Sequence, residues 1–183
     1  MSEKFRLPKH ILLKCDHNTT TDKLIENYYH YYYDLVREKN IQTVLEIGVR
    51  AGYSMYAMAS ANLKLDYTGI DLNHGTHGGI VGAINHAKGL AKDFPEANIS
   101  ITEGNSEHYK VEKFYDLIHI DGDHSYRGCM ADLEKFTLHG KYIFIDDYDY
   151  IGQVKKAVDE FIGKYDLQYK YIPSHTNLRS KKY

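Results

Sequence analysis

The sequence has few cysteines and no long apolar run. Cys15 and Cys129 are its only cysteines, and their spacing fits neither a disulfide framework nor a cysteine-ligated metal. No segment approaches the roughly 20 apolar residues that cross a bilayer, and the first residues lack the apolar core of a signal peptide. These absences predict a reduced, cytoplasmic protein with no membrane segment.

An excess of charge of either sign is also missing. The 23 basic and 25 acidic side chains give a formal net charge of -2. This balance disfavours general nucleic-acid binding and attachment to a membrane surface, both of which use a broad positive field. The length suits a single domain over 1–183, with a helical segment at 1–40 and a core at 41–183.

Short apolar runs rich in β-branched residues alternate with stripes of apolar residues at helical spacing. The predicted strands are 43–49, 66–71, 98–102, 115–121 and 141–146, and the predicted helices are about 24–36, 52–63, 80–93, 126–138 and 154–165. This alternation predicts an α/β fold with a doubly wound, mostly parallel, Rossmann-like sheet and helices on both faces. The segments 167–173 and 177–183 look like a final hairpin, which would add a C-terminal antiparallel strand.

A glycine loop follows the first predicted strand, in the sequence EIGVRAGYS. Gly48 allows a tight turn, and Gly52 opens the next helix, whose first N–H groups lack helical partners. Asp71 ends the second strand 23 residues after Gly48, where an acid can bind ribose hydroxyls. The sequence therefore favours a nucleotide-like cofactor here. The alternative is that the glycines only mark a turn and that Asp71 caps a helix.

The loop is neither of the two common phosphate-binding loops. Arg50 replaces the second glycine of the dinucleotide fingerprint, and the lysine of a P-loop is absent. Glu46 would repel a phosphate but suits the cationic amino-acid part of a ligand.

These residues resemble the first motif of the class I S-adenosylmethionine-dependent methyltransferases, which has an acid, a glycine and a second glycine at this spacing. The resemblance covers about 43–162 and departs from the common pattern at Arg50. It implies S-adenosyl-L-methionine as cofactor, with adenine contacts from the segment EGNSE. The implied cofactor-binding residues are Glu46, Gly48, Gly52, Ser54, Asp71, Asn105, Ser106 and Asp121.

Two neighbouring strands both end in acidic residues. The segment YDLIHIDGDHSY places Asp121 at the end of the fourth strand, and KYIFIDDYDY places Asp146 and Asp147 at the end of the fifth. Adjacent strands lie ~4.8 Å apart, so these carboxylates can converge, and they repel one another unless a cation or a proton intervenes. Oxygen ligands favour Mg²⁺, Mn²⁺ or Ca²⁺. The alternative of solvated, helix-capping acids is preferred for Asp123 and Asp149.

The same segments are similar to those of small metal-dependent O-methyltransferases, which have a DGDHSY-type segment. The similarity implies Asp121, Asp146 and Asp147 as ligands of a divalent metal, Mg²⁺ first, with His124 and Asp121 in catalysis and His124 as general base. A loop histidine that stabilises a turn is the alternative for His124. We interpret His119 as a core residue, and His74 and His77 as part of a loop rather than a lid.

The leading hypothesis is metal-assisted O-methylation of a small-molecule or glycan-like hydroxyl. One rival is another reaction on the same scaffold, hydroxylase-like or cofactor-cleaving, and a second is a non-catalytic module that binds S-adenosylmethionine. Because few residues lie outside the predicted core, a large substrate, a second subunit of a homo-oligomer or the amino-terminal helix has to complete the pocket.

Overall fold

The computed structural model describes residues 4–13, 29–76 and 79–172. Its sheet has five parallel strands in the order β3-β2-β1-β4-β5. The strands are β1 (Thr43–Ile47), β2 (Asp66–Asp71), β3 (Asn98–Glu103), β4 (Tyr115–Ile120) and β5 (Gly140–Ile145). The predicted parallel α/β sheet is confirmed, and β4 and β5 are neighbours on one side of β1, as the sequence indicates.

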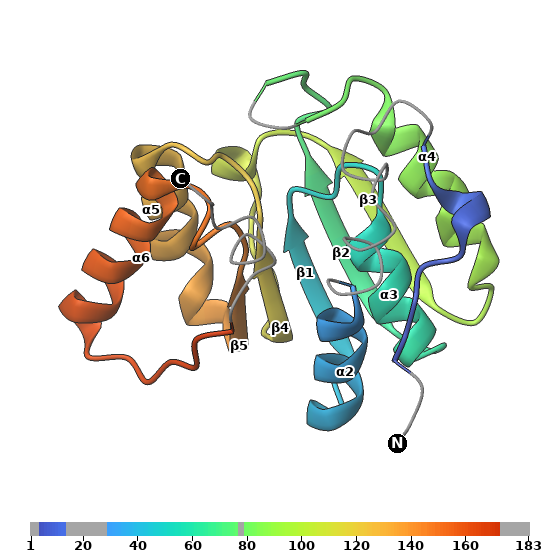
Figure 1. The fold of residues 1–183 in the computed structure, drawn as a ribbon, viewed down its shortest axis with the longest axis horizontal. Coiled ribbons are helices and arrows are strands. Elements are labelled where there is room, and N and C mark those ends of the chain that lie inside the picture. Colours follow the sequence, from blue (N-terminus) through green and yellow to red (C-terminus); the bar gives the residue numbers. More distant parts are fainter. Residues whose placement is uncertain (1–3, 14–28, 77–78, 173–183) are drawn as a thin grey trace, which may run out of the picture.

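The helices lie on both faces of this sheet. They are α2 (His30–Lys39), α3 (Tyr53–Ala61), α4 (Ala83–Leu90), α5 (Tyr126–Phe136) and α6 (Gly152–Tyr165), with the short 3-10 turns η1 (Lys9–Ile11), η3 (Ala91–Asp93), η4 (Ser106–His108) and η5 (Thr137–His139). Figure 1 shows α5 and α6 together beside β5, and α3 and α4 at the other side of the molecule. No helix among the described residues is long and apolar enough to cross a membrane.

Two apolar clusters fill the space between sheet and helices. Val44, Tyr67 and Leu117 pack with residues of α2, α3 and α4, whereas Leu45 and Ile118 pack with residues of α5 and α6. Because side chains alternate along a strand, each central strand supplies both clusters. This explains why the strands read as continuous apolar runs.

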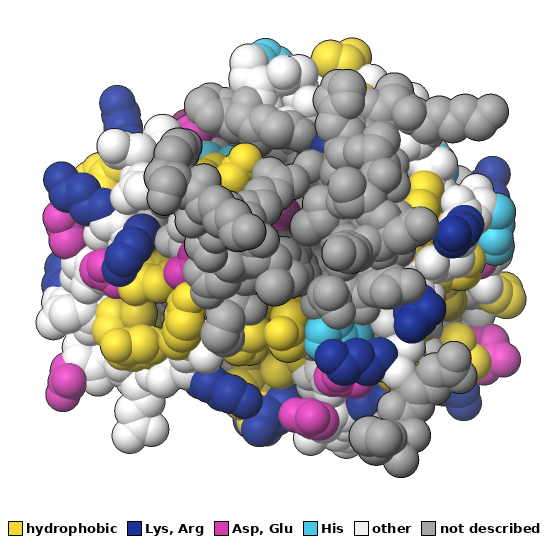
Figure 2. Space-filling model, viewed as in Figure 1, with side chains coloured by type: hydrophobic (Ala, Val, Ile, Leu, Met, Phe, Trp, Pro, Cys, Tyr) yellow, Lys and Arg dark blue, Asp and Glu magenta, His cyan; other side chains and the backbone are white. Residues whose placement is uncertain are grey.

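The charged surface agrees with the balanced composition. Among the described residues on the face in view, Figure 2 shows basic and acidic side chains interspersed, with no broad area of one sign.

The prediction of a C-terminal hairpin is wrong for its first strand. Residues 167–172 form no strand: the chain leaves α6 through Asp166 in the left-handed conformation (φ 49°) and continues with Leu167, Tyr169 and Tyr171 exposed. No described strand pairs with this segment, so its alternating apolar residues are not buried against the sheet. The second expected strand, at 177–183, lies outside the described residues, as do positions 24–28 of the first predicted helix.

Gly48 stands where the backbone after β1 meets the end of β4. Its φ is 91°, and a Cβ at this position would lie 1.9 Å from the carbonyl oxygen of Asp121. The close approach of two backbone segments therefore requires glycine here, before any ligand is considered.

Gly48→Ala should lower the free energy of unfolding by about 2 to 6 kcal/mol, the sum of a strained left-handed backbone and an overpacked contact. Gly163→Ala is the control, because Gly163 lies in α6 with open space at the Cβ position and a helical alanine should stabilise by about 0.5 to 1 kcal/mol. Urea unfolding of both variants measures the difference. Equal stabilities would contradict the close contact.

Candidate active site

The loop between β1 and α3 has three residues with positive φ. They are Gly48 (91°), Arg50 (48°) and Gly52 (81°). Arg50 thus adopts the left-handed conformation that glycine adopts most readily, at the cost of some strain. Its backbone N–H donates to Asp71 Oδ2 at 2.7 Å, which fixes the loop to the end of β2. Although Arg50 departs from the common pattern of the motif, the loop therefore still makes a tight turn.

Asp71 lies at the carboxyl end of β2 and holds backbone amides. Besides the Arg50 amide, its Oδ1 accepts from the Asn73 N–H at 2.6 Å. Asp71 does not cap a helix, because α4 begins only at Ala83. Each carboxylate oxygen has two lone pairs, so Asp71 can accept further hydrogen bonds from a ligand.

Glu46 lies in the middle of the molecule with 0% of its surface exposed. The hydroxyls of Ser54 and Tyr67 donate to its carboxylate, and His119 Nδ1 lies 2.8 Å from Oε1. Because Ser54 is in the first turn of α3, this cluster holds the start of that helix against the sheet. A direct contact of Glu46 or Ser54 with a cofactor stays a prediction, since both side chains are buried.

His119 is held at both ring nitrogens. Its Nε2 lies 3.3 Å from the Tyr32 hydroxyl, whose proton is donated to Asp146 Oδ2 at 2.9 Å. The Tyr32 hydroxyl and the Glu46 carboxylate therefore give each ring nitrogen of His119 a polar partner. Burial lowers the pKa of His119, but its hydrogen bond to Glu46 and the nearby carboxylates raise that pKa above the ordinary value. His119 is a satisfied core histidine, as predicted from the sequence.

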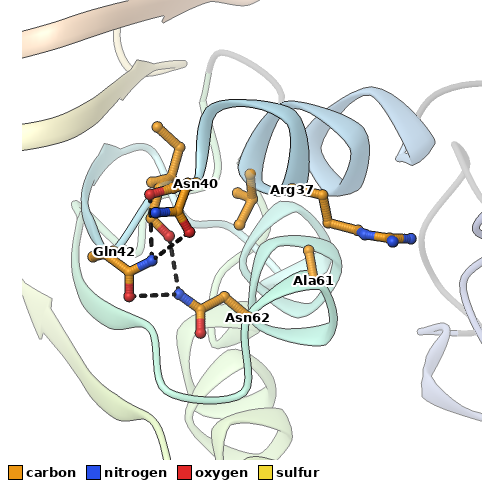
Figure 3. Close-up of a pocket in the computed structure, with 7 residues that line it drawn as sticks. Arg37, Asn40, Gln42, Ala61 and Asn62 are labelled. Atoms are coloured by element: carbon orange, nitrogen blue, oxygen red, sulfur yellow. Dashed lines mark hydrogen bonds between the residues drawn. The ribbon is translucent and has the colours of Figure 1, made fainter.

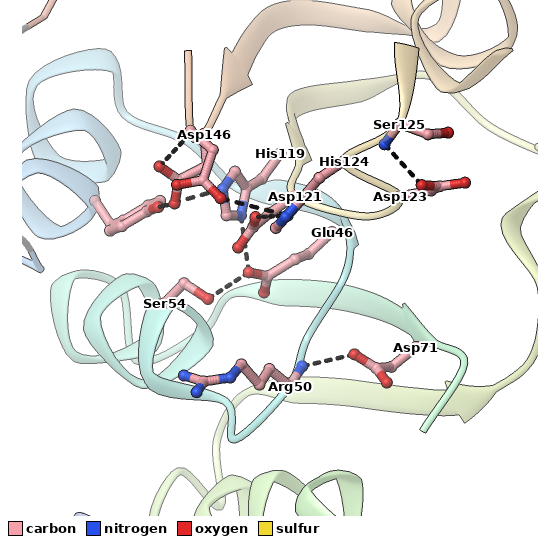
Figure 4. Close-up of polar contacts among 12 residues, drawn as sticks. Glu46, Arg50, Ser54, Asp71, His119, Asp121, Asp123, His124, Ser125 and Asp146 are labelled. Carbon is pink, nitrogen blue, oxygen red and sulfur yellow. Dashed lines mark hydrogen bonds and ion pairs between the residues drawn. The ribbon is translucent and has the colours of Figure 1, made fainter. Parts of the chain in front are cut away.

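The acids of β4 and β5 converge at the carboxyl edge of the sheet (Figure 4). Potential ligand atoms of His119, Asp121 and Asp146 lie within 4.8 Å of one another, and so do those of Asp121, His124 and Asp147. Asp121 belongs to both groups. We call the five residues the acid cluster. His124 Nε2 lies 3.3 Å from Asp121 Oδ1 and 3.4 Å from Asp147 Oδ2.

Two consecutive acids reach the cluster because β5 has already ended. Side chains of neighbouring strand residues point to opposite faces, so Asp146 and Asp147 would diverge in a continuing strand. The strand stops at Ile145, and Asp147 adopts a left-handed backbone conformation with a φ of 56°. This turn brings the Asp147 carboxylate to His124.

The carboxylates of the cluster hold protons more strongly than isolated acids do. Burial and the charge of Asp147 raise the pKa of Asp146 to about 7, and burial and the charge of Asp121 raise the pKa of Asp147 to about 6. The hydrogen bond to Asp121 raises the pKa of His124 despite partial burial. Burial is the larger cause for both acids, and the charge of a neighbouring carboxylate adds to it.

Asp123 and Asp149, which we expected outside the metal site, lie outside the acid cluster. Asp123 Oδ1 accepts from the Ser125 N–H at 2.8 Å, just before α5, whose first turn is capped by Ser125. Asp149 is half-buried rather than fully solvated, and it accepts a hydrogen bond of 2.5 Å from the Tyr171 hydroxyl. His74 is exposed beside Thr76, and His77 lies outside the described residues.

The segment after β3 is fixed to α5. Asn105 caps η4 by accepting from the Glu107 N–H at 2.8 Å, and the Ser106 hydroxyl donates to Asp132 Oδ1 at 2.7 Å. Asp132 is 4% exposed, and burial raises its pKa to about 6. The sequence analysis missed Asp132, whose helical position gives no signal of a polar partner. It also missed Tyr32, which lies in the apolar stripe of α2.

A separate hollow lies at the amino end of β1, lined by Val36, Arg37, Asn40, Ile41, Gln42, Ala61 and Asn62 (Figure 3). The Asn62 amide donates to the Ile41 carbonyl at 2.9 Å and to the Gln42 side chain at 3.3 Å. These polar groups satisfy one another at the edge of the sheet opposite the acid cluster. We assign the hollow no part in the active site.

A family model described as a methyltransferase domain matches residues 45–148, more than half of the chain. The fold and this match define the class of the protein as an S-adenosylmethionine-dependent methyltransferase. The chain belongs to the methyltransferase domain family.

Solved structures with the same fold agree with this assignment. A protein from Staphylococcus aureus, assigned as a caffeoyl-CoA O-methyltransferase, is 25% identical with a TM-score of 0.59, over 76% of this chain and 73% of its own. The methyltransferase PaMTH1 from Podospora anserina is 16% identical with a TM-score of 0.59, over 81% and 74%. The O-methyltransferase from Bacillus cereus is 15% identical with a TM-score of 0.54, over 75% and 68%. A search of curated proteins found no match.

Asp132→Asn should remove a pH dependence of stability. The folded pKa of about 6 exceeds the ordinary value, so the stability that Asp132 contributes is present below about pH 4 and is lost as pH rises through 6. Between pH 4 and 8, the free energy of unfolding of the wild type should fall by about 2 to 3 kcal/mol relative to the variant. Denaturant unfolding across this range measures it, with Glu134→Gln on the same helix as control. Parallel curves for wild type and Asp132→Asn would refute the buried titration.

Proposed function

We propose that the protein transfers the methyl group of S-adenosylmethionine to a hydroxyl of a small-molecule or glycan-like acceptor, assisted by a divalent cation. The observation that carries the proposal is the acid cluster beside the glycine loop, at the carboxyl edge of one parallel sheet. Ligands of such sheets bind at this edge, near the first strand. The Staphylococcus aureus protein, assigned as an O-methyltransferase, supports an oxygen acceptor.

The residues around the loop fit the cofactor. Gly48 and Gly52 let the backbone turn directly into α3, whose first N–H groups point to the same edge as the Asp71 carboxylate. Asp71 would accept from the ribose hydroxyls, and Asn105 and Ser106 would line the adenine side from η4. When bound, the cofactor supplies an electrophilic methyl group.

The acid cluster fits a hard divalent cation. Asp121, Asp146 and Asp147 offer carboxylate oxygens, the ligands that Mg²⁺ and Mn²⁺ prefer. Burial and the neighbouring carboxylates raise the pKa values of Asp146 and Asp147, and a bound cation would stabilise their charged forms. When bound, the cation makes an acceptor hydroxyl more acidic.

His124 takes the proton of the acceptor in this proposal. It lies at the open edge beside Asp121, and both Asp121 and Asp147 hold its protonated form in the present arrangement. A cation on the same carboxylates would compete with that proton and leave the imidazole neutral, as a general base requires. The glycine loop would then orient the cofactor and the acid cluster the acceptor, so that the acceptor oxygen lies in line with the methyl group.

The rival reactions on this scaffold differ in their products. A cofactor-cleaving or hydroxylase-like enzyme would leave the labelled methyl group of S-adenosylmethionine off the acceptor, whereas methyl transfer places it on the acceptor oxygen. Mass spectrometry after incubation with methyl-labelled cofactor and a panel of hydroxylated acceptors separates the two. Family membership sets the non-catalytic alternative aside.

Asp71→Ala should weaken S-adenosylmethionine binding by roughly 1.5 to 3 kcal/mol, the value of hydrogen bonds to a charged group. Asp66→Ala is the matched control, because Asp66 lies at the opposite end of β2 in an exposed ion pair with Lys113. Calorimetric titration measures both affinities. An unchanged affinity in folded Asp71→Ala would remove the ribose assignment.

Asp121→Asn and Asp146→Asn should each abolish Mn²⁺ binding and methyl transfer, and Asp146→Asn should leave binding of S-adenosylhomocysteine nearly unchanged. The physical reason is that each variant removes a charged ligand, while the glycine loop stays intact. Asp149→Asn should retain Mn²⁺, because Asp149 contacts Tyr171 outside the acid cluster. Calorimetry with Mn²⁺, and activity after chelation, provide the measurements.

A wild-type protein that binds no Mn²⁺ with the cofactor present, and that keeps full activity in chelator, would eliminate the metal from the mechanism. His124 would then act without a cation.

A further inference from the structure

Tyr32 reaches the acid cluster from α2, a helix outside the residues that the family model matches. It is only 1% exposed, and its ring packs against His119 and Phe144 with centroid distances of 4.9 and 5.0 Å. The packing of the ring therefore fixes the position of the Tyr32 hydroxyl between His119 and Asp146.

The hydroxyl of Tyr32 fixes one of the two oxygens of Asp146. It donates to Oδ2 at 2.9 Å, while Oδ1 accepts from the Asp147 N–H at 2.7 Å. Each oxygen keeps a second lone pair for another partner. The two hydrogen bonds thus fix the orientation of the Asp146 carboxylate, and each oxygen can still accept one further bond.

The same hydroxyl continues the buried hydrogen-bond chain. From Tyr32 the chain passes to His119 and then to Glu46. Glu46 accepts from Ser54, at the start of α3. A phenylalanine at position 32 would fill nearly the same volume, so packing alone does not require the hydroxyl. A buried hydroxyl costs free energy unless its hydrogen bonds are made, and here they are made to the acid cluster.

We propose that Tyr32 is a positioning residue of the metal site, whose hydroxyl orients the Asp146 carboxylate toward the cation. This inference rests on the proposed metal-assisted function. Groups that hydrogen-bond to metal ligands typically change metal affinity about 10- to 100-fold when they are removed. Through His119 and Glu46, the same hydroxyl links the orientation of Asp146 to the start of α3, the helix that follows the glycine loop.

The test compares Tyr32→Phe with Tyr33→Phe in the full chain. Tyr33 is on the same helix, but its ring stacks on Phe5 at 4.6 Å, away from the acid cluster. Mn²⁺ affinity is measured by calorimetry, and the environment of the bound ion by its electron paramagnetic resonance spectrum. S-adenosylhomocysteine affinity without metal and thermal unfolding report on the rest of the fold.

We expect Tyr32→Phe to bind Mn²⁺ about 10- to 100-fold more weakly with an altered spectrum, to bind S-adenosylhomocysteine within about twofold of the wild type, and to match Tyr33→Phe in overall fold. Tyr33→Phe should bind Mn²⁺ as the wild type does.

Wild-type Mn²⁺ affinity in Tyr32→Phe would overturn the positioning role and leave the proposed metal function intact. An equal loss of Mn²⁺ and S-adenosylhomocysteine affinity, with a lower unfolding temperature, would reassign Tyr32 to core packing and also overturn it. If the wild type itself binds no Mn²⁺, the metal part of the proposed function fails and this inference fails with it.

Discussion

The buried contact between Glu46 and His119 is the constraint on which the site depends. The two residues face each other across β1 and β4, with Nδ1 and Oε1 2.8 Å apart and neither side chain reaching solvent. A buried ion pair is tolerated only when its remaining hydrogen-bonding capacity is used, and Ser54, Tyr67 and Tyr32 use it here. The glycine loop and the acid cluster therefore share one rigid support.

Two residues of the candidate site have strained backbone conformations that orient neighbouring groups. Arg50 and Asp147 both have positive φ values, although neither is glycine. Arg50 closes the loop onto Asp71, and Asp147 turns a second carboxylate toward His124. Such positions cost free energy and persist because the surrounding packing determines them.

The sequence predicts the sheet well because buried parallel strands are continuous apolar runs, and it predicts the acid cluster because the carboxyl ends of β4 and β5 must meet at one edge. It does not predict the contact of Tyr32 with the acid cluster. Tyr32 occupies an apolar position of α2, and that position looks the same in the sequence whether or not the hydroxyl makes a hydrogen bond. The sequence also does not predict that Glu46 is buried, because an acid near the end of a strand can equally well contact a ligand. At 167–172 the alternating pattern has no partner among the described strands, which only the tertiary structure reveals.

The distances along the chain set the order in which the site can be assembled. Tyr32 and Asp146 are 114 positions apart, and Glu46 and His119 are 73 apart. Contacts between such distant segments close long loops of chain, so they carry a loop-closure entropy that contacts between neighbouring residues do not. The acid cluster is complete only when β5 has joined the edge of the sheet. A chain still emerging from the ribosome therefore lacks the cluster until Asp147 has been made.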